Sequence, residues 1–276
     1  MKKIMIMLLM IFLIIVNLYA ANPPADFEYQ ISDDGTYLVI YGFKNNKSTY
    51  IIPETIEGFP VKRVSIGGGG TWNASEVVGN AKQITITLGK NISYFYFGLD
   101  HVISNIIITG LSDNLIVCDI VSSLSKPITV KGSIDSLSNL KVIKCYNVFF
   151  DNKSLVIKKE WVGYVFRGTN LEEVTFEEGI STIGRFDIRG VDKEFPYGNK
   201  SLDMVFAENK YLKKVSFPST LEIINYNTFL SCSKLSELVI PDGLTDILFN
   251  ADCFQGTALP LKIQAKLRQL GYKDSF

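Results

Sequence analysis

The stretch that decides the fold is LKKVSFPSTLEIINYNTF, residues 212–229, which is followed shortly afterwards by LSELVIPDGLTDI, residues 235–247. A related copy, LEEVTFEEGISTI, covers residues 171–183. In all three copies the first five apolar residues follow one another at steps of three, two, four and three. The distance from Leu212 to Leu235 falls within the periods of about 20–50 residues that are typical of solenoids, in which each coil buries its apolar residues against its neighbours.

The first two of these copies start at Leu171 and Leu212, almost two repeats apart, which predicts an insertion around 191–208. That stretch, VDKEFPYGNKSLDMVFAE, is polar and contains a Pro and a Gly, as loops often do. A sixth apolar position of the pattern falls on Ile188, Phe229 and Phe254, although the last of these is displaced by two positions.

Weaker copies precede the clear ones, as alternating apolar pairs at nearly even steps of about one repeat. Such alternation predicts one short strand per coil, with one face toward the core. Between residues 140 and 166 the register stays open, because two further pairs compete for the next strand. The weaker pairs are Val64/Ile66, Ile84/Ile86, Ile106/Ile108 and Ile128/Val130, and the competing pairs are Val142/Cys145 and Leu155/Ile157.

Both ends of the repeat region have the pattern of caps, which a solenoid needs. Alternating residues on either side of Asp33-Asp34-Gly35 predict a β-hairpin. Near the other end, Pro260 suits the start of a helix, and Ile263, Leu267 and Leu270 fall on one helical face. That spacing predicts a C-terminal capping helix.

The first twenty residues have the pattern of a secretory signal peptide. Lys2 and Lys3 precede an apolar run from Ile4 to Val16, and Ala20 suits the cleavage site. The run is short for a membrane span, which needs about 20 residues, so an uncleaved anchor is the alternative. We expect no membrane span after cleavage. The predicted organisation is a signal peptide over 1–20, an N-terminal β cap over 21–60, a solenoid over 61–257 with the insertion near 191–208, and a capping helix and tail over 258–276.

Composition argues against several classes of function. The 28 basic and 28 acidic residues balance, whereas nucleic-acid binders usually carry a basic excess. Without Lys2 and Lys3 the mature chain has two basic residues fewer, which gives it a net charge of −2. The single histidine, His101, cannot form a multi-histidine metal site.

Four cysteines, Cys118, Cys145, Cys232 and Cys253, have no CxxC spacing, which argues against zinc and thioredoxin-type chemistry. We expect them to be buried small residues. Export would allow disulfides, and the pair worth testing is Cys232 with Cys253, since these lie about one repeat apart.

No catalytic, metal or cofactor motif is recognisable. Gly67–Gly70 lacks the Gly-Lys-Ser/Thr ending of a phosphate-binding loop. His101 beside Asp100 is expected in a polar loop rather than in a catalytic triad. The pairs Glu172/Glu173 and Glu177/Glu178 flank one strand, where neighbouring side chains point to opposite faces, so a glycosidase pair is not expected.

The pattern L-x-x-V-x-[F/I]-P-x-x-[L/I]-x-x-I in 212–229 and 235–247 resembles the BspA-type leucine-rich repeats of bacterial surface proteins. The stretches 27–43, 50–67 and 253–276 are similar to the terminal segments of that family, whereas about 90–165 departs from its repeat because the Pro after the strand is missing. The resemblance implies a leucine-rich-repeat solenoid, of the α/β class by convention and strand-rich here. It also implies a secreted or cell-surface protein that adheres to other proteins, including host matrix or serum proteins.

A stacked parallel sheet presents a broad face, and the residues that alternate with the buried ones are candidates for binding a protein ligand. The loops at 67–75 and 191–209 are the alternative binding regions. The candidate residues of the strand face are Thr85, Thr87, Thr129, Lys131, Glu173, Thr175, Lys214, Ser216 and Glu237.

Two other functions stay open. A parallel β-helix enzyme acting on polysaccharide has coils of similar length, but one strand per coil and the lack of an acidic cluster argue against it. A structural envelope protein without a ligand is the third hypothesis.

Overall fold

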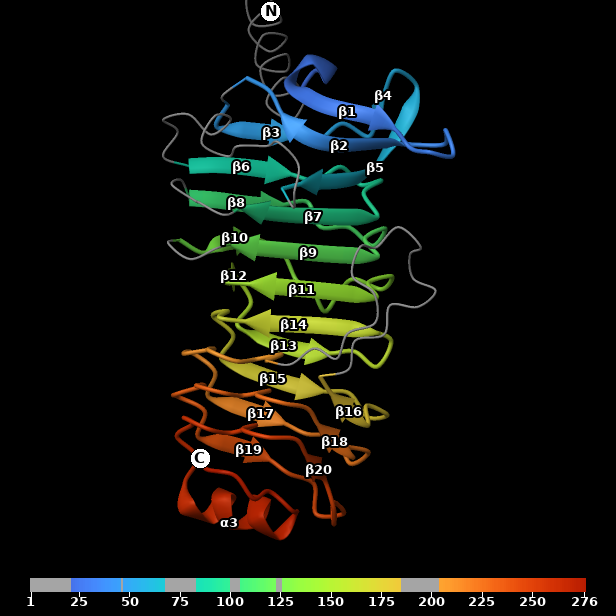
Figure 1. Ribbon diagram of the computed structural model, residues 1–276. Coiled ribbons are helices and arrows are strands. Elements are labelled where there is room, and N and C mark those ends of the chain that lie inside the picture. The colour runs from blue at the N-terminus through green and yellow to red at the C-terminus, as the bar shows by residue number, and fades with distance from the viewer. Residues whose placement is uncertain (1–20, 46, 68–82, 100–104, 123–125, 185–203) are drawn as a thin grey trace, which may run out of the picture.

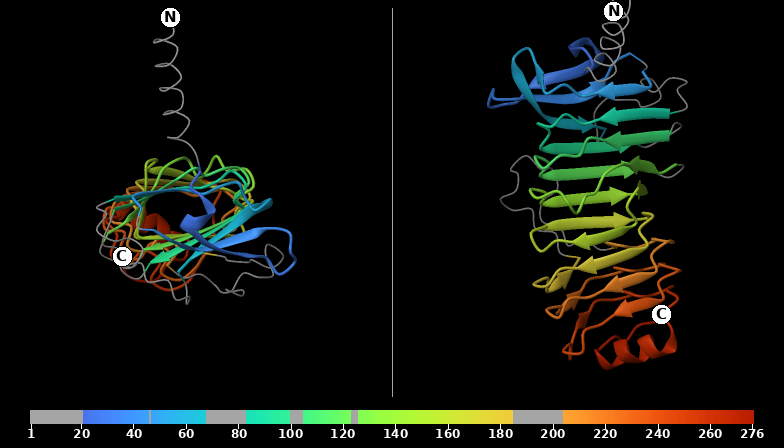
Figure 2. Two further views of the ribbon diagram at one scale, coloured as in Figure 1. Left: turned by 90° about the horizontal axis from the view of Figure 1, so that it is seen from above. Right: turned by 180° about the vertical axis from the view of Figure 1, so that it is seen from behind.

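The computed structural model describes residues 21–45, 47–67, 83–99, 105–122, 126–184 and 204–276, and it stacks them as parallel coils in one column (Figure 1). Seen from above, the coils superimpose as a flattened ring (Figure 2). The predicted solenoid is therefore confirmed. Residues 1–20, His101 and Ile188 lie outside the described residues.

Two sheets build the N-terminal part of the column. Sheet A runs in the order β1 (Phe27–Ile31), β2 (Leu38–Phe43), β5 (Phe59–Ile66), β7 (Tyr94–Leu99), β9 (Val117–Ser122), β11 (Val142–Tyr146) and β14 (Gly163–Arg167), and the short β4 (Thr55–Ile56) pairs with β5. Sheet B contains β3 (Thr49–Ile51), β6 (Gln83–Thr87), β8 (Asn105–Thr109), β10 (Ile128–Val130) and β12 (Val148–Phe150).

Two further sheets continue the column toward the C-terminus. Sheet C contains β13 (Ser154–Ile157), β15 (Glu173–Phe176), β17 (Lys214–Ser216) and β19 (Glu237–Val239). Sheet D contains β16 (Thr182–Ile183), β18 (Ile223–Ile224) and β20 (Leu248–Phe249). Apart from the pairs β1/β2 and β4/β5, the paired strands are parallel.

The expectation of one strand per coil is wrong, because the chain enters at least two sheets in each coil, and between residues 142 and 157 it enters sheets A, B and C in turn. Val64 and Ile66 belong to β5 of sheet A, which pairs with β7, whereas Ile84 lies in β6 of sheet B, which pairs with β8. The step from Val64 to Ile84 therefore joins strands on different sides of the column. Sheet A was missed because its outward residues, such as Val117 and Val142, are themselves apolar and buried, so alternation is lost.

Between residues 140 and 166, both of the apolar pairs that compete for the next strand lie in strands. Val142 and Cys145 lie in β11 of sheet A. Leu155 pairs with Val174 and Ile157 with Phe176, so β13 is the first strand of sheet C.

A ladder of stacked rings runs through the core of the C-terminal coils. The ring centroids of Phe166 and Phe206 are 5.8 Å apart, those of Phe206 and Phe229 5.6 Å, and those of Phe229 and Phe254 5.5 Å. The interplanar angles are 15°, 11° and 15°. Tyr272 ends the ladder with its edge against Phe254, at 5.3 Å. Each ring thus fills the space that the next coil leaves open.

Phe206 occupies in its coil the position that Phe229 and Phe254 occupy in the next two, whereas the predicted Ile188 lies outside the described residues. The amide of Phe166 donates to the carbonyl of Val205, and that of Phe206 donates to the carbonyl of Thr228. Val205, Phe206 and Ala207 are fully buried, so the predicted loop over 191–208 is wrong for its last residues. Because most residues of that stretch are polar, its composition does not indicate that the last few belong to the core.

The N-terminal cap is the antiparallel hairpin of β1 and β2, preceded by a 3-10 turn (Pro24–Asp26). Gly35 lies in its turn with φ of +72°, which favours glycine. The buried Asp26 accepts hydrogen bonds from Asn22 and Asn45 and pairs with Lys47. Burial alone would raise the pKa of Asp26, but these donors outweigh it and lower that pKa.

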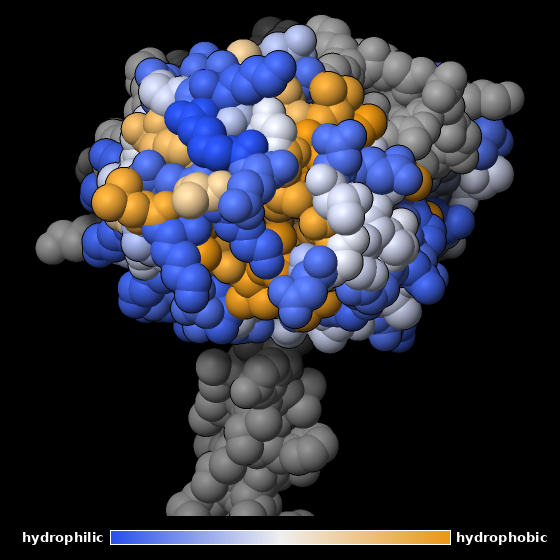
Figure 3. All heavy atoms as spheres, turned by 90° about the horizontal axis from the view of Figure 1, so that it is seen from below, coloured by the Kyte–Doolittle hydropathy of each residue, from blue (hydrophilic) through white to orange (hydrophobic). Residues whose placement is uncertain are grey.

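The C-terminal cap is helix α3 (Leu261–Gln269), as predicted. Leu267 and Leu270 are buried and Ile263 packs partly against the core. The cap leaves apolar side chains exposed among polar ones at this end of the molecule (Figure 3). Within the described residues no helix is long and apolar enough to cross a membrane.

All four cysteines are buried and free, so the candidate pair Cys232 and Cys253 does not form a disulfide. The thiol of Cys232 donates to the carbonyl of Phe206 at 3.1 Å, and that of Cys253 to the carbonyl of Asn250 at 2.8 Å. Burial raises the pKa of each of these two thiols to about 12. They act as small core residues, as expected.

Replacement of Phe229 by Ala should lower the free energy of unfolding by about 3–5 kcal/mol, because it removes the middle ring between two neighbours. Urea denaturation followed by circular dichroism measures the loss. The control is Tyr226→Ala in the same coil, where the ring is 44% exposed and the expected change is below about 0.5 kcal/mol. Equal losses in the two variants would contradict the importance of the ladder.

Candidate functional site

The nine predicted surface residues do not lie on one sheet, which corrects the expected single face. Thr85, Thr87 and Thr129 lie on sheet B, and Lys131 directly follows β10. The other five, Glu173, Thr175, Lys214, Ser216 and Glu237, lie on sheet C. Sequence periodicity gives the spacing of strands but not the side of the coil on which each strand lies.

On sheet B, the three predicted threonines lie beside their register partners. Thr85 and Thr129 both pair with Ile107, and Thr129 also pairs with Phe149. The hydroxyls of Thr87 and Thr109 are hydrogen-bonded at 3.0 Å. This face is half-buried and weakly charged, so it exposes few side chains that a partner protein could contact.

On sheet C, outward residues of opposite charge alternate in register. Glu173, Lys214 and Glu237 follow one another across β15, β17 and β19. The Lys214 ammonium lies 3.0 Å from the Glu237 carboxylate, whose hydrogen bond and charge raise the pKa of Lys214. The next outward row consists of Thr175, Ser216 and Val239.

A second charged row lies at the start of the same strands. Glu172 pairs with Lys213 at 2.5 Å and with Lys153 at 2.9 Å, and these bonds lower the pKa of Glu172 to about 2. Exposed ion pairs contribute little stability singly. Their main effect here is to hold a fixed pattern of charge along the column.

An exposed aromatic residue adjoins sheet C, and sequence reasoning missed it. Tyr211, which lies shortly before β17, is 42% exposed. Its ring meets Phe149 edge-on at 5.8 Å, and the Lys234 ammonium lies 5.5 Å from its centroid. Tyr211 directly precedes the buried Leu212 of the repeat, but only the fold shows that its ring stays at the surface.

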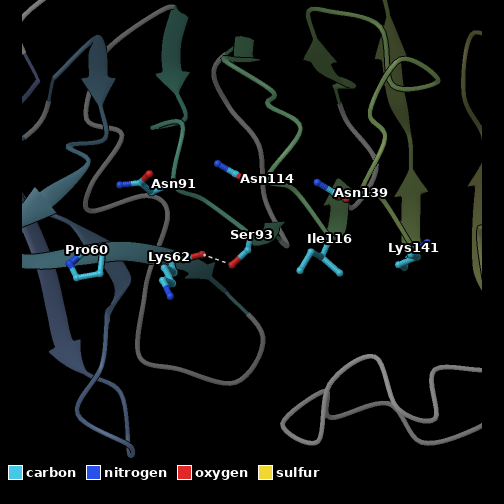
Figure 4. A pocket seen from close by; sticks show the side chains of 8 residues that line it. All are labelled: Pro60, Lys62, Asn91, Ser93, Asn114, Ile116, Asn139 and Lys141. Atoms are coloured by element: carbon cyan, nitrogen blue, oxygen red, sulfur yellow. Dashed lines mark hydrogen bonds between the residues drawn. The ribbon is translucent and has the colours of Figure 1, made fainter.

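The structure also contains a groove of about 560 Å³ at the start of the sheet A strands. Four successive coils each supply two residues, two positions apart (Figure 4). The lining residues are Pro60, Lys62, Asn91, Ser93, Asn114, Ile116, Asn139 and Lys141.

The three asparagines of this groove are held by the preceding coil. The side-chain amide of Asn91 donates to the carbonyl of Glu54 at 3.2 Å, that of Asn114 to the carbonyl of Lys90 at 2.9 Å, and that of Asn139 to the carbonyl of Asp113 at 2.7 Å. They recur at steps of about one repeat, which is the signal that would have located them in the sequence.

Three of the four acidic residues considered in the sequence bond to groups of neighbouring coils. Glu177 bonds to Lys158 and to the amide of Lys159, and Glu178 accepts from the amide of Ser219 at 3.0 Å. No group of three metal-ligating side chains occurs in the described ranges. Gly68–Gly70 and His101 lie outside these ranges.

Asp119 is the unusual charged residue of the fold. It lies on β9 and is fully buried, and its carboxylate oxygens have no hydrogen-bond partner among the described residues. The Lys144 ammonium lies 3.7 Å away. Burial raises the pKa of Asp119 to about 6, although Lys144 acts in the opposite direction.

The repeat class defined by this fold agrees with comparisons with known proteins. Residues 159–272 match the BspA type leucine rich repeat region, in six copies. This part of the chain is therefore a BspA-type leucine-rich-repeat region, and the predicted resemblance is confirmed. Comparison with curated protein sequences gave no match.

Three solved structures are similar to the chain. A leucine-rich repeat protein from Bacteroides ovatus has a TM-score of 0.54 at 16% identity, and the match covers 85% of this chain and 56% of that one. The T. pallidum leucine rich repeat protein has a TM-score of 0.49 at 18% identity, covering 93% and 99%. A leucine rich cell surface protein from Faecalibacterium prausnitzii has a TM-score of 0.26 at 11% identity, covering 85% and 80%. The similarity to the B. ovatus protein shows a shared fold.

The Asp119 carboxyl should make the protein less stable as the pH rises from about 4 to about 6. Its pKa is higher in the folded state than its ordinary 3.8, so folding takes up a proton in this window and stability falls with pH by on the order of 3 kcal/mol. The variant Asp119→Asn should remove this dependence and be more stable than the wild type at pH 7. Urea denaturation at several pH values measures both effects.

The control is Asp242→Asn, because the Asp242 side chain is fully exposed beside the Lys266 ammonium and its replacement should change the free energy of unfolding by less than about 0.5 kcal/mol. A less stable Asp119→Asn at pH 7 would contradict the prediction and would mean that the charged carboxylate stabilises the fold.

Proposed function

We propose that this chain is a secreted or cell-surface protein that binds other proteins without catalysis, and that it adheres to host matrix or serum proteins. The observation that carries the proposal is the outward face of sheet C, where charged side chains alternate in register beside exposed apolar ones. Leucine-rich repeats generally bind proteins, which supports this assignment.

The sheet C face has the composition of a small interaction surface. Val239 is 44% exposed in the row beside Lys214 and Glu237, and Tyr211 projects at the edge. Tyrosine is enriched at protein interfaces because it offers a large apolar ring and a polar end. Since the four strands span only about 15 Å at about 4.8 Å each, a partner of ordinary interface size also contacts the flanking turns.

Export is the second part of the proposal and rests on residues 1–20. Lys2 and Lys3, the apolar run to Val16 and the small Ala20 fit a cleaved signal peptide. The other two hypotheses, a polysaccharide-active enzyme and a ligand-free envelope protein, are the alternatives that the binding experiments below distinguish.

Expression of the full chain in a bacterial host should release a protein that begins at Ala21, as measured by mass spectrometry of the culture or periplasmic fraction. Replacement of Leu9 by Arg should keep the chain inside the cell, because it interrupts the apolar run. Recovery of a membrane-bound chain that still carries residues 1–20 would instead favour the uncleaved anchor.

Binding of residues 21–276 to immobilised matrix and serum proteins tests the interaction face. Tyr211→Ala should weaken capture about tenfold or more, as expected of an aromatic residue that anchors an interface. Tyr226→Ala is the matched control, since its ring is similarly exposed but lies outside sheet C.

Charge variants separate recognition from folding. Lys214→Glu breaks the alternation, whereas the triple variant E173K/K214E/E237K restores it with opposite signs. If a partner recognises the signs of these charges, both variants should lose binding. The triple variant should keep the wild-type melting temperature, because its charges still alternate. Binding that survives in Tyr211→Ala and in both charge variants would contradict a site on sheet C. Failure to capture any partner would favour the envelope hypothesis, and release of unsaturated sugars from a polysaccharide would favour the enzyme.

A further inference from the structure

The groove at the start of the sheet A strands repeats once per coil. Its lining pairs are Pro60/Lys62, Asn91/Ser93, Asn114/Ile116 and Asn139/Lys141. The second members are joined through the backbone: Ser93 donates to Lys62, Ile116 to Ser93 and Lys141 to Ile116, at 2.9, 2.8 and 2.9 Å. Because adjacent parallel strands lie about 4.8 Å apart, the groove is a straight track about 15 Å long.

The groove combines hydrogen-bond acceptors with cations. Each asparagine uses its amide nitrogen to hold the preceding coil, which fixes its orientation. The three side-chain oxygens accept no hydrogen bond from the residues that the structure describes. Lys62 lies in the first coil of the groove and Lys141 in the fourth. The Lys62 ammonium lies 5.9 Å from the centroid of the Tyr37 ring, and neither lysine forms an ion pair with a carboxylate of the described residues. Ile116 adds a small apolar surface between Ser93 and Lys141, and Pro60 adds another at the end of the asparagine row.

We infer that this groove binds a linear acidic oligosaccharide. Sugar hydroxyls can donate to the asparagine oxygens, sugar carboxylates can pair with the two lysines, and the C–H faces of the rings can rest on Ile116 and Pro60. The rise of one coil is comparable with the length of one pyranose unit in an extended chain. An extended peptide fits less well, because its N–H groups point to one side only about every 6.6 Å.

This inference is independent of the proposed protein-binding face. The groove lies within residues 60–141, whereas the matched repeat region covers 159–272 and sheet C begins at Ser154. The row of asparagines is thus a feature of the coils that depart from the family repeat. A variant of the groove should leave capture of a protein by sheet C unchanged.

Isothermal titration of residues 21–276 with oligogalacturonate of four to six units tests the inference. We expect saturable binding to the wild type that weakens with added salt. The double variant Lys62→Ala/Lys141→Ala should weaken binding about tenfold or more, because it removes two charge-assisted contacts. Asn114→Ala should weaken binding as well, with its melting temperature measured to show that the coil remains folded.

The matched control is Lys210→Ala/Lys273→Ala, which removes two exposed lysines outside the groove and should bind as the wild type does. Two further probes are a neutral malto-oligosaccharide and a poly-glutamate peptide of equal charge, and both should bind much more weakly. Absence of oligogalacturonate binding to the folded wild type would overturn the inference, as would equal losses in the two lysine variants. Equal binding of poly-glutamate would overturn it too, and would assign the groove to acidic protein instead.

Discussion

The fixed rise from one coil to the next is the constraint on which the rest of this structure depends. No coil can bury its own apolar residues, so each must place them directly above and below those of its neighbours. The ladder of Phe166, Phe206, Phe229 and Phe254 shows the consequence most clearly, because each ring fills the gap beneath the previous one. Tyr272, in the C-terminal cap, covers the last ring of the ladder with an edge-to-face contact to Phe254.

The same rise orders the surface. Outward residues at equivalent positions of successive coils form rows along the column. Opposite charges alternate in the rows that contain Glu172 and Lys214, and amides follow one another at Asn91, Asn114 and Asn139. Rows with free hydrogen-bonding capacity can bind a ligand, whereas rows that pair internally mainly hold the coils in register. The two proposed sites differ in this respect: sheet C offers a broad face and the groove offers a narrow track.

Periodicity predicted the solenoid, the hairpin and the capping helix, because regular spacing of apolar residues is a local property of the chain. Periodicity gave the wrong grouping of strands where two sides of a coil have the same alternation of apolar residues. Spacing alone places Val64 in the series of Ile84, although the two lie in different sheets. The polar residues before Phe206 predict a loop there, and its core position follows only from its contacts with Phe166 and Phe229.

Regular spacing of apolar residues along the chain is enough to predict that it stacks coils, where its clearest copies lie, and that those copies resemble BspA-type repeats. Which residues share a surface follows from the folded structure alone. The nine predicted residues separate onto two sheets, while Lys62 and Lys141 line one groove although they lie several repeats apart in the chain. The physical reason is that spacing along the chain determines which residues point inward, whereas the path of each coil determines the side on which the outward residues lie.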